Sequence, residues 1–459
     1  MATAPGPPAD GSGPAAPSPA DPMAILRSRS YVLGLVLAGA IGVPVSALAY
    51  GFLALVSWSQ KFLFTELPSD LGFSKAPVWW PLPLLALSGI LVALCIRHLP
   101  GGGGHSPSEG FKTGSPTPPV DLPGIALAAL ATLALGAVLG PEAPLIAIGG
   151  GLGALAVRLV KKDTPPTAAA LIATAGSFAA ISTLLGSPLL GAFLLMEAAG
   201  LGGAMLGVAL LPGLLAAGIG SLVFVGLDSL TGLGTFSLAI PDLPTFTTPT
   251  VGMFFWALVL GLLCPAIAWS IYSVARSLRP FVHAHRMLVT PALGLLVAAV
   301  AIAFSQITGK DVSELLFSGQ SALPGLVTQA GTWSVGALLL LIVGKSLAYG
   351  LSLSAFRGGP VFPSMFIGAA VGLVGSHLPG MAVVAGVGIG IGAMCVSMLK
   401  LPFTSVLLAT VLLSSDGYAV MPLVIVAVVV AHVATAWLPE PSVRLFGQHP
   451  EPSPVAVTA

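Results

Sequence analysis

The chain has 459 residues, of which 56% are hydrophobic and only 7% are charged, and its formal net charge is +1. Soluble domains carry about 25% charged residues, so this composition excludes an ordinary soluble protein of this length. The net charge does not indicate a partner, and the lack of a basic patch argues against nucleic acid. Cys95, Cys264 and Cys395 lie within apolar runs and indicate small core residues rather than a metal site or a disulfide framework.

The N-terminal 22 residues are rich in Pro, Ala and Gly, and they lack a basic start followed by an apolar stretch. This composition predicts a disordered tail rather than a cleaved signal peptide. Apolar runs then recur along the chain, for example at 31–55, 82–96, 251–270, 288–304 and 421–437. Because about 20 apolar residues cross the hydrocarbon layer as a helix, we predict an all-α, polytopic membrane protein.

Basic residues predict how the chain is oriented. Arg27 and Arg29 precede the first apolar run, and Lys and Arg concentrate in short cytoplasmic loops, so we expect a cytoplasmic N-terminus in the cell membrane. Further cytoplasmic ends are expected at Arg97, Arg158, Lys161, Lys162, Arg276, Arg279 and Arg286. Stretches 60–78, 228–248 and 306–330 contain few basic residues and are expected outside.

Many apolar segments are cut short, among them 125–139, 188–200, 363–374 and 402–414. Interrupted helices of this kind form ion sites at the middle of the membrane in transport proteins. Two segments also echo each other: glycines follow Pro144 and Pro363 at the same offsets of five and nine residues. We therefore expect two inverted-topology repeats of tilted and re-entrant helices, at 23–240 and 241–440, and a short tail at 441–459.

Three stretches place a helix start beside Gly or Pro within the apolar body, at 101–111, 140–144 and 357–366. Free N–H groups at a helix N-terminus hold anions, so three converging ends would form an anion site. Glu142 lies at one of these ends and would occupy the site as a competing anion. The alternative is that Glu142 merely complements the dipole of its own helix, although an ionisable residue in an apolar run is a functional candidate.

The order of three segments carries a family resemblance: GPEAP at 140–144, PLLGAFLLMEAAG at 188–200 and GKSLAYGLSLSAFRGGPVFPSMFIGAAVG at 344–372. It resembles the CLC chloride channels and proton-coupled anion exchangers, which implies the CLC fold, a homodimer with one pore per subunit, and no cofactor. The family motif Gly-x-Glu-Gly-Pro corresponds to 140–144, with Ala143 in place of the second glycine. By this resemblance Glu142 is the gating glutamate, and the Ala143 N–H is an anion ligand.

The family's Gly-x-Phe-x-Pro motif is matched at 358–363 with the phenylalanine displaced by one residue. The resemblance then implies that the N–H groups of Val361 and Phe362 bind the anion. Pro360 has no N–H, so one donor of the family is absent.

The first anion motif of the family, Gly-Ser-Gly-Ile-Pro-Glu, is the least well matched. If Pro107 corresponds to its proline, Gly104 stands where the anion-contacting serine belongs, and Ser106 and Ser108 are candidates by proximity. Val443 stands where the family has a late tyrosine. These departures leave the preferred anion open.

Glu197 and Ala198 bear on the choice between channel and exchanger. The resemblance aligns Ala198 with the internal proton glutamate of the exchangers, and alanine cannot relay a proton. We therefore expect passive, glutamate-gated anion conduction, with proton-coupled chloride antiport as the alternative if Glu197 or water carries protons. Glu197 could equally be an acid bonded to backbone at a helix end. Lys345 would add positive potential near the pathway, or would snorkel to an interface.

Other functions fit the residues less well. A cation-coupled solute transporter would also contain broken helices. Gly344-Lys345-Ser346 ends like a phosphate-binding loop, but the glycine that such a loop needs at position 339 is a leucine. We do not expect an enzyme.

Overall fold

The computed structural model describes residues 22–110, 117–160, 166–200, 206–232, 240, 243–246 and 248–441. Within these ranges the named secondary-structure elements are helices, and one isolated antiparallel bridge joins Gly140 and Gly359. Of the two predicted tails only Pro22 and Pro441 are described, and Lys161, Lys162 and Val443 lie outside the described residues.

Eight helices in the described part are long and apolar enough to cross a membrane. They are α2 (Arg29–Lys61, continued by η1, Phe62–Glu66, and α3, Leu67–Asp70), α4 (Pro81–His98), α6 (Glu142–Val160), α9 (Leu206–Thr231), α10 (Val251–Ala284), α11 (Arg286–Thr308), α13 (Val335–Ala355) and α17 (Gly417–Trp437). Their apolar side chains remain exposed over much of their length. This is expected for surfaces that face lipid, and it agrees with the predicted multi-pass membrane protein.

The described chain contains further helices besides these eight spans. They are α1 (Pro22–Leu26), η2 (Pro100–Gly103), η3 (Pro107–Glu109), η4 (Pro119–Asp121), α5 (Leu122–Ala134), α7 (Pro166–Leu185), α8 (Pro188–Ala198), η5 (Val312–Glu314), α12 (Leu323–Thr328), η6 (Ala330–Thr332), α14 (Val361–Gly375), α15 (Val383–Leu399), α16 (Pro402–Leu412) and η7 (Ser414–Asp416). Helix α14 begins two residues earlier than predicted, because Val361 and Phe362 already form its first turn before Pro363.

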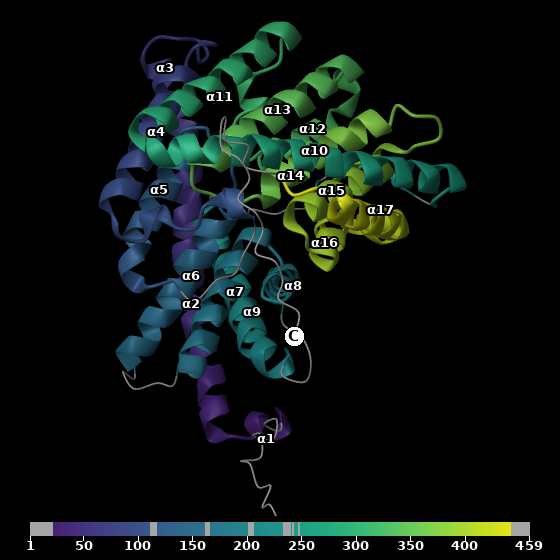
Figure 1. The fold of residues 1–459 in the computed structure, drawn as a ribbon. Helices are drawn as coiled ribbons and strands as arrows, with labels where there is room; N and C mark the ends of the chain where they lie inside the picture. Colours follow the sequence, from purple (N-terminus) through teal and green to yellow (C-terminus); the bar gives the residue numbers. More distant parts are fainter. Residues whose placement is uncertain are drawn as a thin grey trace, which may run out of the picture.

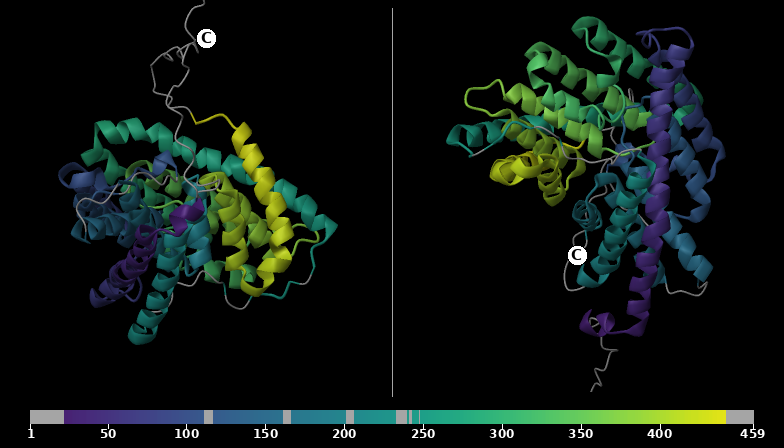
Figure 2. Two further views of the ribbon diagram at one scale, coloured as in Figure 1. Left: turned by 90° about the horizontal axis from the view of Figure 1, so that it is seen from below. Right: turned by 180° about the vertical axis from the view of Figure 1, so that it is seen from behind.

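The same pairs of helices pack in both halves of the described chain. Helix α6 packs on α7 as α14 packs on α15, α2 packs on α9 as α10 packs on α17, and α4 packs on α5 as α11 packs on α13. In Figure 1 the first-half helices α2, α6, α7 and α9 run mostly upright, whereas α10, α13, α15 and α17 run mostly across the view. Figure 2 shows α2 standing along one side of the first half. The boundary at 240/241 stays a prediction.

The repeated glycines have a packing role in both halves. A Cβ atom on Gly149 would overlap the carbonyl oxygen of Gly176 on α7. A Cβ atom on Gly368 would likewise overlap the carbonyl oxygen of Gly390 on α15. The echo in the sequence therefore reflects the close approach of two equivalent helix pairs.

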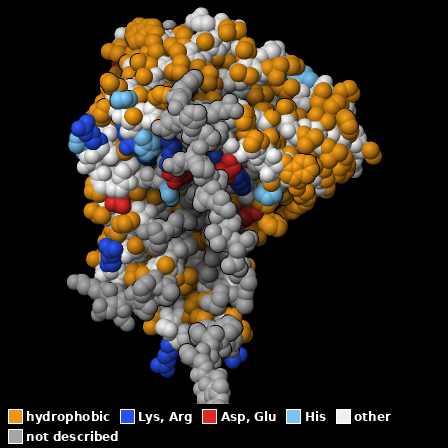
Figure 3. Space-filling model, viewed as in Figure 1, with side chains coloured by type: hydrophobic (Ala, Val, Ile, Leu, Met, Phe, Trp, Pro, Cys, Tyr) orange, Lys and Arg blue, Asp and Glu red, His pale blue; other side chains and the backbone are white. Residues whose placement is uncertain are grey.

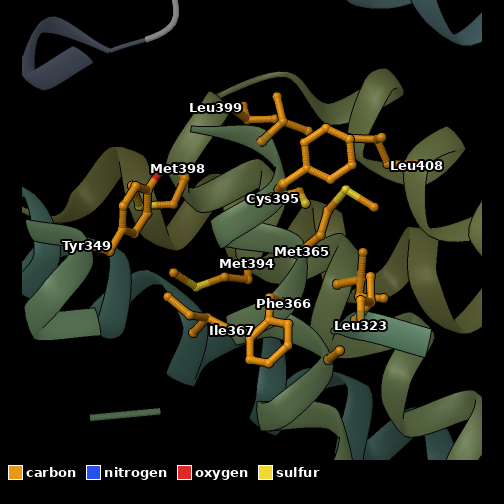
Figure 4. Close-up of a cluster of buried hydrophobic side chains, with 14 of the residues drawn as sticks. Leu323, Tyr349, Met365, Phe366, Ile367, Met394, Cys395, Met398, Leu399 and Leu408 are labelled. Atoms are coloured by element: carbon orange, nitrogen blue, oxygen red, sulfur yellow. The ribbon is translucent and has the colours of Figure 1, made fainter. Parts of the chain in front are cut away.

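The largest apolar core surrounds α14 and α15, whose side chains are almost all buried. Figure 4 shows part of this core, where Met394 of α15 and Phe366 of α14 lie between Tyr349 of α13 on the left and Leu323 of α12 on the right. Burial on all sides places α14 inside the protein, where the free N–H groups at its N-terminus can face a site rather than lipid.

Candidate functional site

The chain segments that lead into α6 and α14 meet in an antiparallel bridge. The Gly140 N–H donates to the Gly359 carbonyl at 2.8 Å, and the Gly359 N–H donates to the Gly140 carbonyl at 2.5 Å. Each glycine lies four residues before the proline of its repeat, Pro144 or Pro363. Equivalent positions of the two echoed segments are thus paired, which brings the N-termini of α6 and α14 together.

Glu142 extends from the first turn of α6 to the first turn of α14. Its side chain is completely buried, and its Oε1 accepts a hydrogen bond of 2.8 Å from the Phe362 N–H. Its Oε2 has no hydrogen-bond partner among the described residues. A Cβ atom on Gly140 or Gly359 would overlap the carboxylate, so the acid occupies its observed position only because both residues are glycine. The acid therefore faces the dipole of the other helix, α14.

Two buried hydroxyl groups form hydrogen bonds with the chain segments that lead into α14 and α6. The Tyr349 hydroxyl donates to the Pro360 carbonyl at 3.0 Å, and the Ser352 Oγ accepts from the Val138 N–H at 3.1 Å. Both residues lie on α13 and are buried. Neither residue was predicted from the sequence, although two polar residues three positions apart in an apolar helix are a signal of a polar neighbour.

A cavity of about 510 Å³ lies on the first-half side of this site. Among the predicted anion ligands, Gly104, Ser106 and Ala143 line it, whereas Val361 and Phe362 do not. The predicted ligands are therefore divided between two neighbouring places: the cavity, and the α14 N-terminus that Glu142 occupies. Ser106 donates to or accepts from Ser108 at 2.9 Å.

Arg357 also lines the cavity and is only 8% exposed. Its guanidinium donates to the carbonyls of Gly102 at 3.4 Å and Phe356 at 3.3 Å, and no carboxylate in the described part of the chain lies within 4.0 Å. Burial, and secondly the nearby Arg286, lower the pKa of Arg357 to about 10. The guanidinium therefore stays charged at pH 7, and its positive charge can attract anions into the cavity.

Glu197 caps another helix. Its carboxylate accepts from the Phe403 N–H at 2.9 Å, and from the Thr404 N–H at 2.8 Å and hydroxyl at 2.7 Å, at the start of α16. Like Glu142, it is an acid of the first half that binds a helix N-terminus of the second half. This contact is the backbone-bonded arrangement that was one of the two alternatives for Glu197.

Lys345 is completely buried, which contradicts the alternative that it snorkels to an interface. Its Nζ donates to three successive carbonyls, those of Glu314 at 3.1 Å, Leu315 at 3.2 Å and Leu316 at 3.1 Å. It also lies 4.1 Å from the ring centroid of Phe366 on α14. Its ammonium group thus uses all three donors to fix the 314–316 segment above α14, because an unpaired buried charge would be costly.

Comparison with known proteins identifies the family. Residues 108–436, more than two thirds of the chain, match the family described as "Voltage gated chloride channel". The chain belongs to this family, the CLC family. The "Putative ion-transport protein YfeO" of Escherichia coli (strain K12 / DH10B) is 30% identical over 361 residues, which cover 77% of this chain and 81% of that protein. The protein of the same name from Escherichia coli O9:H4 (strain HS) is 28% identical over 432 residues, which cover 92% of this chain and 98% of that protein.

Solved structures share the fold of this CLC chain. A slow cyanobacterial Cl⁻/H⁺ antiporter has a TM-score of 0.70 at 20% identity, covering 89% of this chain and 95% of that chain. A CLC-type fluoride/proton antiporter has a TM-score of 0.62 at 19% identity, covering 89% and 97%. A eukaryotic CLC transporter has a TM-score of 0.63 at 16% identity, covering 89% and 72%. The predicted all-helical CLC fold is confirmed.

Membership of this family confirms an anion-transport protein rather than an enzyme, and it excludes the cation-coupled solute transporter considered above. It also confirms a multi-pass membrane protein.

Proposed function

We propose that this CLC protein conducts chloride-type anions along a path that Glu142 gates. The observation that carries the proposal is the hydrogen bond from the Phe362 N–H to the Glu142 carboxylate at the buried N-terminus of α14. A negatively charged oxygen occupies a place where uncharged N–H groups and a helix dipole favour an anion. A small anion that reaches this place must displace the acid.

The cavity supplies the second half of the path. An anion drawn in by Arg357 would rest near Gly104, Ser106 and the Ala143 N–H, at the N-terminus of α6. When Glu142 is protonated or swings away, the Val361 and Phe362 N–H groups become free to bind the ion. N–H donors without a full cation bind weakly enough to release the ion, which favours conduction. Lys345 would contribute positive potential from behind α14.

We favour passive conduction over proton coupling. Ala198 offers no titratable group, and the Glu197 carboxylate is already bonded to three donors of α16. Proton-coupled antiport remains the second candidate, because two solved structures with this fold are described as proton antiporters. In an antiporter, protons would cross by a route through Glu197 or water.

Chloride efflux from proteoliposomes, recorded with and without a proton ionophore, distinguishes the two mechanisms. A conducting protein should move chloride only down its electrochemical gradient, whatever the direction of the pH gradient. If an imposed pH gradient drives chloride uphill, and the Glu197→Gln variant loses this coupling, the passive mechanism is wrong and the antiporter is supported.

We also propose a homodimer in the cell membrane with a cytoplasmic N-terminus. Glu142, Phe362 and Arg357 come from one chain, so each subunit would hold a complete path of its own. Light scattering of the purified protein and protease accessibility of an N-terminal tag in oriented vesicles test these two proposals.

A further inference from the structure

A second cavity, of about 440 Å³, lies where α4 ends and α10 turns into α11. It is lined by Ala93 and Arg97 of α4 and by residues 283–288, which include His283, His285 and Arg286. No acidic residue lines it. The cavity is therefore basic, and none of its lining residues lines the cavity of the transport path proposed above, although Arg286 lies near Arg357.

The two arginines of this cavity lack acidic partners. Neither Arg97 nor Arg286 forms an ion pair within 4.0 Å among the described residues, whereas the nearby Arg279 pairs with Glu109. The Arg286 Nε is buried and has no hydrogen-bond partner. Arg286 is also the first residue of α11, where the helix dipole disfavours a cation. Unpaired donors and concentrated positive charge in one hollow favour an anionic ligand.

The helix faces beside the cavity are apolar and exposed. On α4, Ile90 and Leu94 precede Arg97 by seven and three residues, so the three share one helix face, and all are exposed. On α11, Leu288 lines the cavity and Leu295 follows it two turns later, and both are exposed. Helices α4 and α11 pack against each other. In a membrane protein such faces contact acyl chains, and the basic ends of the same faces meet lipid headgroups.

The space-filling view agrees with this arrangement. In Figure 3 Lys, Arg and His side chains gather at the left, near the height of the α4 label in Figure 1, next to orange apolar surface. A second copy of the chain is a poor occupant, because a two-fold interface would bring the same cations opposite one another.

We propose that this cavity binds the phosphodiester headgroup of an anionic phospholipid, with its acyl chains along the exposed faces of α4 and α11. Arg97 and Arg286 would hold the phosphate oxygens through charge-assisted hydrogen bonds, and His283 and His285 would add donors at the rim. The chemistry recognised is a phosphate ester, which a soluble phosphate could also supply. The apolar faces favour the lipid.

Native mass spectrometry of the full chain, titrated with phosphatidylglycerol or phosphatidylcholine, tests the proposal. The wild type should bind phosphatidylglycerol more tightly. Each cation near an anionic surface contributes about 1 kcal/mol, so Arg97→Gln should weaken phosphatidylglycerol binding about fivefold, and Arg97→Gln with Arg286→Gln about 30-fold. The matched control is Arg276→Gln, which removes a neighbouring arginine that pairs with Glu440 instead and should leave the preference unchanged.

Further measurements separate the remaining explanations. Arg97 is exposed, so Arg97→Gln should fold even if the double variant does not, and an Arg97→Lys, Arg286→Lys pair should keep most of the lipid preference. Equal binding of the two lipids, or an unchanged preference in Arg97→Gln, would overturn the proposal. Calorimetric binding of inorganic phosphate as tight as that of phosphatidylglycerol would overturn the lipid assignment in favour of a soluble phosphate. Chloride flux plays no part in these outcomes, so they are independent of the proposed function.

Discussion

Replacing Glu142 with alanine removes the carboxylate from the N-terminus of α14 without touching the donors that it covers. In the wild type the Phe362 N–H donates to the Glu142 Oε1 at 2.8 Å, in a completely buried setting. A hydrogen bond to a charged group contributes about 1.5–3 kcal/mol. An incoming anion must replace this interaction, so its loss should raise chloride affinity by about 10- to 150-fold.

Calorimetric titration of the purified protein with chloride measures this affinity, and efflux from proteoliposomes measures the rate. We expect Glu142→Ala to bind chloride more tightly and to conduct without a dependence on external pH. Glu142→Gln should fall between alanine and the wild type, since an amide oxygen can still accept from Phe362 but carries no charge. The matched control is Glu197→Gln, because Glu197 also accepts N–H groups of a helix N-terminus, at α16, but outside the proposed path.

Unchanged chloride affinity, flux and pH response in Glu142→Ala would refute the competition between acid and anion. An equal rise in affinity in Glu197→Gln would show instead that any exposed helix N-terminus of this protein binds chloride.

Three further outcomes follow from the geometry. Gly359→Ala should displace the Glu142 side chain, because the new Cβ overlaps its carboxylate, and chloride efflux should rise. The same substitution should cause no further rise in a Glu142→Ala background. The control Gly325→Ala should resemble the wild type, because Gly325 has open space around it. Arg357→Gln should slow chloride entry about tenfold or more, because a cation at the cavity wall concentrates anions. Arg357→Lys keeps the charge and should preserve most of the rate. Equal chloride efflux in the wild type and both variants would contradict this role. Burial raises the pKa of Glu314 above its ordinary value of 4.5, and Lys345 partly opposes this shift. The folded state therefore binds the Glu314 proton more tightly than the unfolded state, and the stability of the fold decreases as pH rises past 4.5. The melting temperature of the wild type relative to Glu314→Gln should therefore increase as pH is lowered from 7 towards 4.5, and a difference that does not depend on pH would exclude this assignment.

The amino-acid sequence was sufficient to predict a membrane protein, the broken helices and Glu142 as a candidate functional residue at a helix N-terminus. Each follows from local composition: an apolar run long enough to span, a glycine or proline that ends a helix, and an acid with no polar neighbours in the chain. The equal spacing after Pro144 and Pro363 also anticipated two equivalent helix pairs, because helix packing repeats wherever small residues repeat along one face.

Contacts between distant segments required the tertiary structure. Glu142 meets a backbone N–H that lies 220 residues further along the chain, and no local pattern specifies which helix end an acid will reach. The same reason explains why the partners of Glu197, at α16, and of Lys345, at residues 314–316, were not predicted, although a backbone-bonded Glu197 was one of the two alternatives.

Arg357 shows most clearly the difference between what the sequence indicates and what only the tertiary structure determines. In the sequence it is one charge beside two glycines. Only the tertiary structure brings Arg357, in the connection between α13 and α14, to the carbonyl of Gly102, which buries its guanidinium beside a cavity with no described carboxylate within 4.0 Å. Composition determined that this chain is a membrane protein, because the free energy of transfer from water to the membrane is a sum over residues. The tertiary structure decided where its few charges meet, because that depends on how helices far apart in sequence pack.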